Sequence, residues 1–285
     1  MNTSRLASSF ARRSPVLRSD APLTEEQIRR VAPSIFASDK HASRSVRYTY
    51  IPTGDVLRGL AREGFAPFMV TQSRTRDEAH REHTKHMIRL RHADAITGRS
   101  WDEPQANEII LINSHNGASS YQMLAGVFRF VCSNGLVSGT VHEDIRIPHK
   151  GEILDHVIEG AHRVLQEFRT VDASREAMQA VRLSTPQQIA FGRAALALRY
   201  EDAGGDRPAP ISDVQVIGNR RPEDSAPDLW TTLNRIQENL TRGGLQGRSA
   251  QGRRVTTRPV QGIDANVRLN RALWVLAEEM RRIVA

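Results

Sequence analysis

The stretch that decides the fold is NEIILINSHNGASSYQMLAGVFRFVCSNG, residues 107–135. Two apolar, β-branched and aromatic runs flank the dipeptide Asn116-Gly117. Asn-Gly between two such runs is typical of the tight turn that joins neighbouring antiparallel strands. We therefore predict a β-hairpin here, and with it an antiparallel sheet.

Cys132, the single cysteine of the chain, lies at the end of the second run. A catalytic thiol needs a base and a positive or helix N-terminal environment to become a thiolate. The apolar neighbours Phe128, Phe130 and Val131 would instead bury this thiol, so we expect a small core residue. The following Ser133-Asn134-Gly135 predicts a turn, because Asn and Gly tolerate positive φ.

Two short helices are predicted before this hairpin. Thr24 and Gln27 have the spacing of a capping box at the start of a helix. The segment DVLRGLAREGF, residues 55–65, has apolar residues at helical spacing and a stop at Gly64.

Three further strands are predicted in the same half of the chain. Residues 45–52, SVRYTYIP, are β-branched and aromatic. FAPFMVTQSR, residues 65–74, and KHMIRLRHAD, residues 85–94, follow with a polar turn between them. Alternation along the first of these two strands places Phe68 and Val70 on one side.

Helical periodicity dominates the second half. Amphipathic helices are predicted over residues 151–171, 184–200, 226–244 and 264–285. Residues 243–258 are rich in Gly and Arg and show no periodicity, so we expect a mobile loop.

Strands in the first half and helices in the second indicate the α+β class, with an antiparallel sheet and a short helix followed by a helical C-terminal half. We divide the chain into a flexible basic arm at 1–22, the sheet core at 23–150, and a helical region at 151–285 that packs on the core.

The composition favours a cytoplasmic protein with a polyanionic partner. No stretch approaches about 18 consecutive apolar residues, so no membrane span is expected. A single cysteine argues against a disulfide framework. The formal net charge is +8, and arginine dominates because Lys40, Lys85 and Lys150 are the only lysines. Arginine excess suits phosphate binding, although a GC-rich genome gives the same composition.

Candidate nucleic-acid contacts lie on the predicted strands and in the arginine-rich loop. Arg89 and Arg91 share one face of a strand, opposite Ile88 and Leu90, so one face can pack while the other meets phosphates. The alternative is an ordinary solvated sheet face. The full candidate set is Arg47, Arg74, Arg76, Lys85, Arg89, Arg91, Arg248, Arg253 and Arg254.

Signals for an enzyme are weak, and we expect no catalytic activity and no cofactor. The sequence has no Gly-rich phosphate loop and no GxSxG nucleophile motif. His80, His83, His86 and His92 crowd one predicted hairpin, but residues three apart on a strand face opposite sides. A polar hairpin tip is therefore favoured over a metal site.

The sequence resembles the phage- and plasmid-like family called domain of unknown function 932. The resemblance runs from YIPTGDVLRGLAREGF through HMIRLRH and FRFVCSNGL to DLWTTLNRIQENLTRGG and GIDANVRLNRALWVLAEE. Membership implies a mobile-element setting and no established enzymatic activity.

The segment YTYIPTGDVLRGLAREGF, followed by antiparallel strands, is also similar to the opening of single-strand annealing proteins of the Rad-fifty-two type. This resemblance implies a ring-forming homo-oligomer that anneals single-stranded DNA without ATP during recombination. Our hypothesis is thus a nucleic-acid binder, with single-stranded DNA as the favoured partner; the sequence leaves DNA versus RNA open. The alternative is an interaction protein, such as an anti-defence factor, that binds a host protein through its helical half.

Overall fold

The computed structural model describes residues 15–39, 50, 52–93, 105–116, 119, 121–129, 134–138, 145–147, 153–200 and 208–284. The chain forms two compact units. Unit 1 comprises residues 1–135 and 141–168, and unit 2 comprises residues 136–140 and 169–285. The α+β prediction is confirmed, with an antiparallel sheet in the N-terminal half and helices in the C-terminal half.

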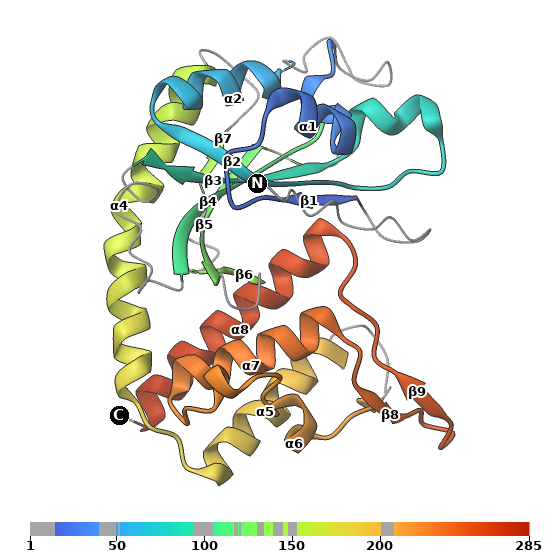
Figure 1. The fold of residues 1–285 in the computed structure, drawn as a ribbon, viewed down its shortest axis with the longest axis vertical. Helices are drawn as coiled ribbons and strands as arrows, with labels where there is room; N and C mark the ends of the chain where they lie inside the picture. The colour runs from blue at the N-terminus through green and yellow to red at the C-terminus, as the bar shows by residue number, and fades with distance from the viewer. Residues whose placement is uncertain are drawn as a thin grey trace. The chain divides into compact units, whose positions relative to one another are not determined.

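Unit 1 is built around the antiparallel sheet, and α1 and α2 lie on the same side of it (Figure 1). The main sheet has the strand order β1-β2-β3-β4-β5-β6, and β7 also pairs with β5. The elements up to β7 are β1 Val16–Arg18, α1 Glu25–Val31, η1 Pro33–Phe36, α2 Thr53–Arg62, β2 Phe65–Gln72, η2 Glu78–His83, β3 His86–His92, β4 Gln105–Asn113, β5 Tyr121–Arg129, β6 Asn134–Val137 and β7 Ile145–Ile147.

The predicted central hairpin is confirmed as β4 and β5. These strands are antiparallel, with Ile109 opposite Ala125 and Leu111 opposite Met123. All four side chains are buried. Because β4 also pairs with β3, it has a neighbouring strand on each side and lies inside the sheet.

The predicted short helices are also confirmed. Thr24 caps α1, and Gln27 returns a hydrogen bond to the Thr24 backbone, which completes the capping box. Helix α2 ends before Gly64, whose φ of 85° is in the left-handed region that favours glycine. Apart from Tyr50 and Pro52, the strand predicted at 45–52 lies outside the described residues.

The predicted strands at 65–74 and 85–94 are confirmed as β2 and β3, but one side-chain assignment in β2 is wrong. Val70 lies opposite Ile88, whereas Phe68 lies beneath the Arg91 guanidinium on the other face. The register shifts between Pro67 and Met69. An extra residue in a strand breaks the two-residue alternation, so Phe68 and Val70 face opposite sides.

Buried polar side chains fasten η1 and α2 to the sheet. Ser34 of η1 donates its hydroxyl hydrogen to Gln72 Oε1 at 2.9 Å and lies 2.9 Å from His86 Nδ1. Thr53, the first residue of α2, lies 3.0 Å from His86 Nε2 and accepts from Asn113 Nδ2 at 3.0 Å. Ser34, Thr53, His86 and Asn113 are fully buried.

The hydrogen-bond partners of His86 fix the tautomer of its imidazole ring. Its Nδ1 lies 3.3 Å from the Thr84 carbonyl oxygen, which can only accept, so Nδ1 carries the hydrogen. His86 Nε2 is then the acceptor and takes the hydrogen of the Thr53 hydroxyl. Burial lowers the pKa of His86 well below its usual value, and the nearby His115 lowers it further, while the Thr84 carbonyl opposes the shift.

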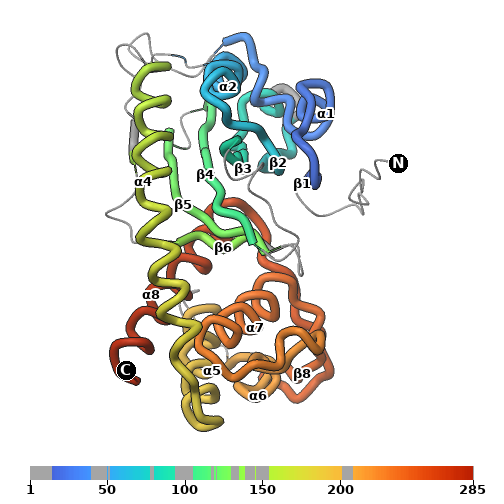
Figure 2. The backbone as a smooth tube through the Cα atoms, turned by 60° about the vertical axis from the view of Figure 1, so that its left-hand side comes forward, coloured from blue at the N-terminus to red at the C-terminus, as the bar shows by residue number. Residues whose placement is uncertain are grey.

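Unit 2 is helical, and its helix α8 packs against both α5 and α7 (Figure 2). Trp230 and Trp274 meet edge to face at a centroid distance of 6.3 Å between α7 and α8. The remaining elements of the chain are α4 Ile153–Ala180, which runs from unit 1 into unit 2, α5 Thr185–Tyr200, α6 Asp213–Val216, η4 Pro222–Asp224, α7 Leu229–Arg242, β8 Gln246–Arg248, β9 Arg254–Thr256 and α8 Ile263–Val284.

The four predicted helices are confirmed as α4, α5, α7 and α8, but residues 243–258 are not the wholly irregular segment that we expect from the sequence. This segment contains the antiparallel strands β8 and β9 in place of an irregular loop. Strands of three residues are too short to give an alternation that can be recognised in the sequence. No helix in the described part of the chain is long and apolar enough to cross a membrane.

We predict that acidification destabilises the protein through His86. Because the pKa of His86 is lower in the folded state, the unfolded state binds more protons, and stability falls as the pH drops below about 6.5. Between about pH 6.5 and 5.5 the free energy of unfolding should fall by up to about 1.4 kcal/mol for this group. Urea unfolding at each pH measures the slope.

The variant His86→Asn should be less stable throughout and should show a shallower pH slope. His156→Gln is the matched control, because His156 is exposed on α4. An unchanged slope in His86→Asn would refute this assignment.

Candidate functional site

Two of the predicted phosphate contacts, Arg89 and Arg91, are buried against a carboxylate. Their side chains are 3% and 4% exposed, and that of Glu108 is 1% exposed. Arg89 Nη1 donates to Glu108 Oε2 at 3.2 Å, and Arg91 Nε donates to Oε1 at 2.9 Å. The predicted exposure is wrong because β3 is buried on both faces.

Aromatic rings and a carbonyl complete the surroundings of these guanidiniums. The Arg91 guanidinium carbon lies 4.2 Å from the centroid of Phe68 and 4.9 Å from that of Phe128. Arg89 Nη2 donates to the carbonyl oxygen of Gly135 at 3.1 Å. Ion pairs, cation–π contacts and burial thus give Arg89 and Arg91 a structural role.

The predicted turn at residues 133–135 is also wrong for its described part. Asn134 begins strand β6, and Gly135 is not among the glycines with positive φ. A Cβ atom on Gly135 would overlap the guanidinium of Arg89. Glycine is therefore needed here for close approach by a side chain. Cys132 lies outside the described residues.

The other candidates in the first half lie near η2. Arg74 and Arg76 are exposed in the segment between β2 and η2, and Lys85 is half-buried just before β3. Arg47 lies outside the described residues. All four belong to unit 1, whereas Arg248, Arg253 and Arg254 belong to unit 2.

The His-rich segment does not gather into a metal centre. His86 belongs to the buried polar chain, and His80 Nδ1 lies 2.5 Å from Asp77 Oδ2. Across the described ranges, no group of three or more His, Cys, Asp or Glu side chains is placed to hold a metal ion.

The hairpin formed by β8 and β9, residues 246–256, has an inner and an outer face. Gly247 pairs with Val255 on the inner face, and both are half-buried. A Cβ on Gly247 would overlap the Pro210 carbonyl, and the backbone N–H of Arg248 donates to that carbonyl oxygen at 2.8 Å. The hairpin is thus seated directly on residue 210.

The outer face of the hairpin carries two arginines. Arg248 lies directly opposite Arg254 in the register, and Gln246 lies opposite Thr256. These four side chains are exposed, as is Arg253 in the turn. The turn is closed by a hydrogen bond of 2.9 Å from the Ser249 N–H to the Arg253 carbonyl oxygen.

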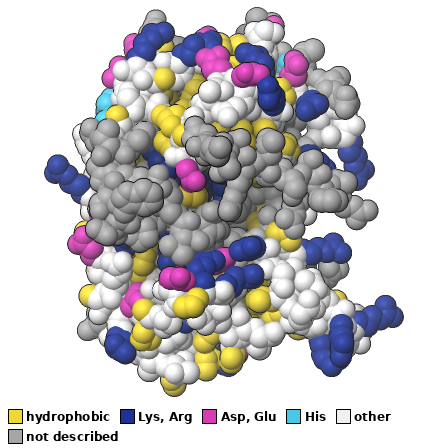
Figure 3. Space-filling model, in the orientation of Figure 1, with side chains coloured by type: hydrophobic (Ala, Val, Ile, Leu, Met, Phe, Trp, Pro, Cys, Tyr) yellow, Lys and Arg dark blue, Asp and Glu magenta, His cyan; other side chains and the backbone are white. Residues whose placement is uncertain are grey.

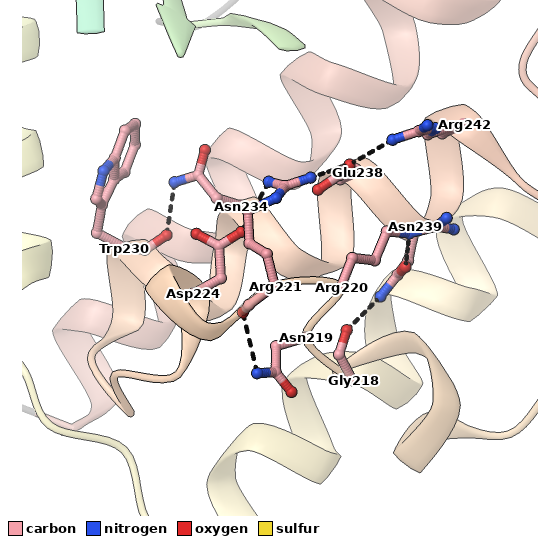
Figure 4. A network of polar contacts seen from close by, with 10 residues as sticks. All are labelled: Gly218, Asn219, Arg220, Arg221, Asp224, Trp230, Asn234, Glu238, Asn239 and Arg242. Atoms are coloured by element: carbon pink, nitrogen blue, oxygen red, sulfur yellow. Dashed lines mark hydrogen bonds and ion pairs between the residues drawn. The ribbon is translucent and has the colours of Figure 1, made fainter. Parts of the chain in front are cut away.

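A buried carboxylate, Glu238 of α7, lies close before the hairpin in the chain and binds two arginines. Arg221 Nη2 donates to Glu238 Oε1 at 2.6 Å, and Arg242 Nη1 donates to the same oxygen at 3.1 Å (Figure 4). Arg221 also donates to Asp224 at 2.9 Å. Glu238 and Asp224 are 3% and 1% exposed in their side chains. These contacts join η4 to the last turns of α7.

Asn239 and Arg220 hold the point at which the chain leaves α7. Arg220 donates to Asn239 Oδ1 and to the Gly243 carbonyl oxygen, each at 2.6 Å. Asn239 Nδ2 donates to the carbonyl oxygen of Val216 and to that of Gly218, each at 2.8 Å; Figure 4 shows the second bond. Burial lowers the pKa of Arg220, and Glu238 opposes that shift.

The hairpin and the residues that flank it carry several arginines and no acid. The segment 239–263 contains Arg242, Arg248, Arg253, Arg254 and Arg258 and no Asp or Glu. Within the described ranges, Arg242 pairs with Glu238, but no carboxylate pairs with Arg248, Arg253 or Arg254. Figure 3 shows Lys and Arg side chains gathered at the lower right, where Figure 1 places the hairpin.

The anchoring residues Arg220, Arg221, Glu238 and Asn239 were not predicted from the sequence. Helix α7 was expected to be amphipathic, which assigns its polar residues to solvent. In the structure α7 is buried around most of its circumference, and its polar residues make internal hydrogen bonds. The sequence signal that correctly marked this region was the helix stop at Gly243-Gly244; both residues have positive φ.

The family described as a domain of unknown function (DUF932) matches residues 40–274. The chain belongs to this family. The match spans both buried carboxylates and the arginine hairpin of this DUF932 protein. The UPF0380 proteins YfjQ and YafZ of Escherichia coli strain K12 are each 53% identical to it over 276 residues, or 97% of each chain. No solved structure matches the chain significantly.

We predict that Glu108→Gln strongly destabilises this DUF932 protein. Removing one partner of a buried ion pair leaves buried charge uncompensated, which costs about 3–5 kcal/mol. Urea unfolding measures the loss. Glu26→Gln is the matched control in unit 1, because Glu26 pairs with Arg30 at the surface and should contribute less than about 1 kcal/mol. Equal losses in the two variants would contradict the structural role of Glu108.

Gly135→Ala should destabilise the protein by about 1–3 kcal/mol, because the added methyl group overpacks the site of the Arg89 guanidinium. A double-mutant cycle with Arg89→Ala tests the cause. If the cost arises at the guanidinium, Gly135→Ala should cost less in the Arg89→Ala background. The same cost in both backgrounds would place the effect elsewhere.

Proposed function

We propose that this protein binds nucleic acid, single-stranded DNA in the first instance, through the outer face of the β8–β9 hairpin. The observation that carries the proposal is the exposed trio Arg248, Arg253 and Arg254, for which the described structure provides no carboxylate partner. Guanidinium groups stay charged at all accessible pH values and bind two phosphate oxygens at once.

The chemistry of the hairpin favours contacts with the backbone over contacts with the bases. Segment 239–263 contains no Phe, Tyr, Trp or His, so it offers no ring on which a base can stack. Phosphate contacts position a ligand without reading its sequence. We therefore propose binding that is independent of sequence and does not use ATP, as befits a mobile-element protein that holds or anneals single strands.

Burial reduces the set of arginines that can contact a phosphate. Arg89 and Arg91 are withdrawn from it, since both are enclosed and paired with Glu108. Arg74, Arg76 and Lys85 remain candidates for additional contacts in unit 1. The hairpin is the better starting point because its backbone is bonded to the Pro210 carbonyl oxygen, and Gly243 just before it is bonded to Arg220 and Asn239.

A protein partner is the second candidate function. Exposed guanidiniums also suit an acidic protein surface, as an anti-defence factor that binds a host protein would require. A host protein that stays bound after nuclease treatment, together with no shift of labelled DNA, would favour this candidate.

The test is a mobility-shift titration with an oligothymidylate across a range of salt concentrations. Three phosphate contacts to a single strand predict a slope of about −2 for log affinity against log salt. Each of Arg248→Gln, Arg253→Gln and Arg254→Gln should flatten the slope by about 0.7 and weaken binding about fivefold at 0.1 M salt. The triple variant should bind about a hundredfold more weakly.

Arg282→Gln is the matched control, because it removes the same charge from the far end of α8. The C-terminus and the hairpin lie on opposite sides of unit 2 in both Figure 1 and Figure 2. Oligothymidylate and oligoadenylate should bind alike. Affinity that ignores salt, or a triple variant that binds like Arg282→Gln, would rule out the hairpin as the binding surface.

A further inference from the structure

We propose that Arg248 and Arg254 together form a clamp for a single phosphate group on the outer face of the hairpin. This inference rests on the proposed function and specifies its chemistry. The clamp would take a phosphodiester of a nucleic-acid backbone or a free phosphate, since both present the same tetrahedral set of oxygens.

The register brings the two arginines together. They face each other directly across two antiparallel strands, and side chains in that position have Cβ atoms about 5 Å apart. Both belong to the exposed face of the hairpin, whereas the neighbouring pair Gly247 and Val255 faces inward. Arg248 and Arg254 can therefore approach one anion from two sides.

One of the two guanidiniums is already oriented. Arg248 Nη1 donates to the carbonyl oxygen of Gly252 at 2.9 Å, which holds the side chain over the turn. An arginine has five N–H donors, so this bond leaves four on Arg248 for a ligand. Gly252 itself has a φ of 75°, the left-handed conformation that closes the turn.

Repulsion between the two facing guanidiniums favours the binding of an anion between them. Like charges directly opposite each other in a sheet destabilise it. The segment from 239 to 263 contains no acid that could compensate, and the described structure shows no carboxylate paired with either arginine. An anion between the two guanidiniums would replace this repulsion by two charge-assisted contacts.

The backbone below the clamp cannot easily relax to separate the charges. The Arg248 N–H is bonded to Pro210, and Gln215 Nε2 donates to the Gln246 carbonyl oxygen at 2.8 Å. At the base of the hairpin, Gly244 N–H donates to the Thr257 carbonyl oxygen at 2.8 Å, and Thr257 N–H donates to that of Leu245 at the same distance. The arginine pair is thus preorganised for its ligand.

Thermal unfolding of the full chain in sodium phosphate and in sodium chloride of matched ionic strength tests the clamp. In chloride, Arg254→Gln should raise the unfolding midpoint by about 1–3 °C, because it removes the repulsion. Arg248→Gln should gain less, because it also loses the hydrogen bond to Gly252. The double variant should gain no more than Arg254→Gln alone. Phosphate should raise the midpoint of the wild type and leave that of either variant unchanged.

Arg253→Gln is the matched control, because it removes the same charge next to Arg254 but from the turn, outside the facing pair. It should keep the stabilisation by phosphate. Loss of that stabilisation in Arg253→Gln as well would show a diffuse charge effect and overturn the clamp. So would an Arg254→Gln variant that melts below the wild type in chloride.

The clamp and the proposed function fail in different ways. If phosphate does not stabilise the wild type while oligothymidylate still binds with a steep salt dependence, the clamp is wrong and nucleic-acid binding stands. If phosphate stabilises the wild type through both arginines but oligothymidylate does not bind, the clamp is right and its ligand is free phosphate.

Discussion

A buried carboxylate that accepts hydrogen bonds from two arginines organises each unit of this protein. Glu108 holds Arg89 and Arg91 inside the sheet, and Glu238 holds Arg221 and Arg242 in unit 2. A charge removed from water is tolerated only when it is paired, so each carboxylate confines its arginines to one geometry. These ion pairs link β3 to β4 in unit 1 and η4 to α7 in unit 2.

The requirement that buried charges be paired separates two groups of arginines. One group forms internal ion pairs, and the other is exposed and is the one that the proposed function uses. A basic chain of this kind looks like a polyanion binder throughout, yet several of its arginines are used internally. Arg248, Arg253 and Arg254 differ because no acid lies near them in the sequence and none pairs with them in the described structure. Their guanidiniums are exposed to solvent on a hairpin whose backbone is hydrogen-bonded to Pro210.

Much of the fold was predictable because its signals are local. The β4–β5 hairpin, the Thr24 capping box and the helix stops at Gly64 and Gly243 each have a signal in a few neighbouring residues. The bulge that turns Phe68 away from Val70 was not predictable, since it depends on pairing with β3. The hairpin of residues 246–256 was missed because its strands are only three residues long.

By itself, the sequence determined the fold class, the order of the main elements, and the acid-free run of arginines after α7. The tertiary structure decided which arginines reach solvent, why Gly135 must be a glycine, and that Arg248 faces Arg254. Alternation along a strand tells which residues share a face, but what covers that face comes from distant parts of the chain. Burial and charge pairing are long-range properties, so they emerge only when the chain has folded.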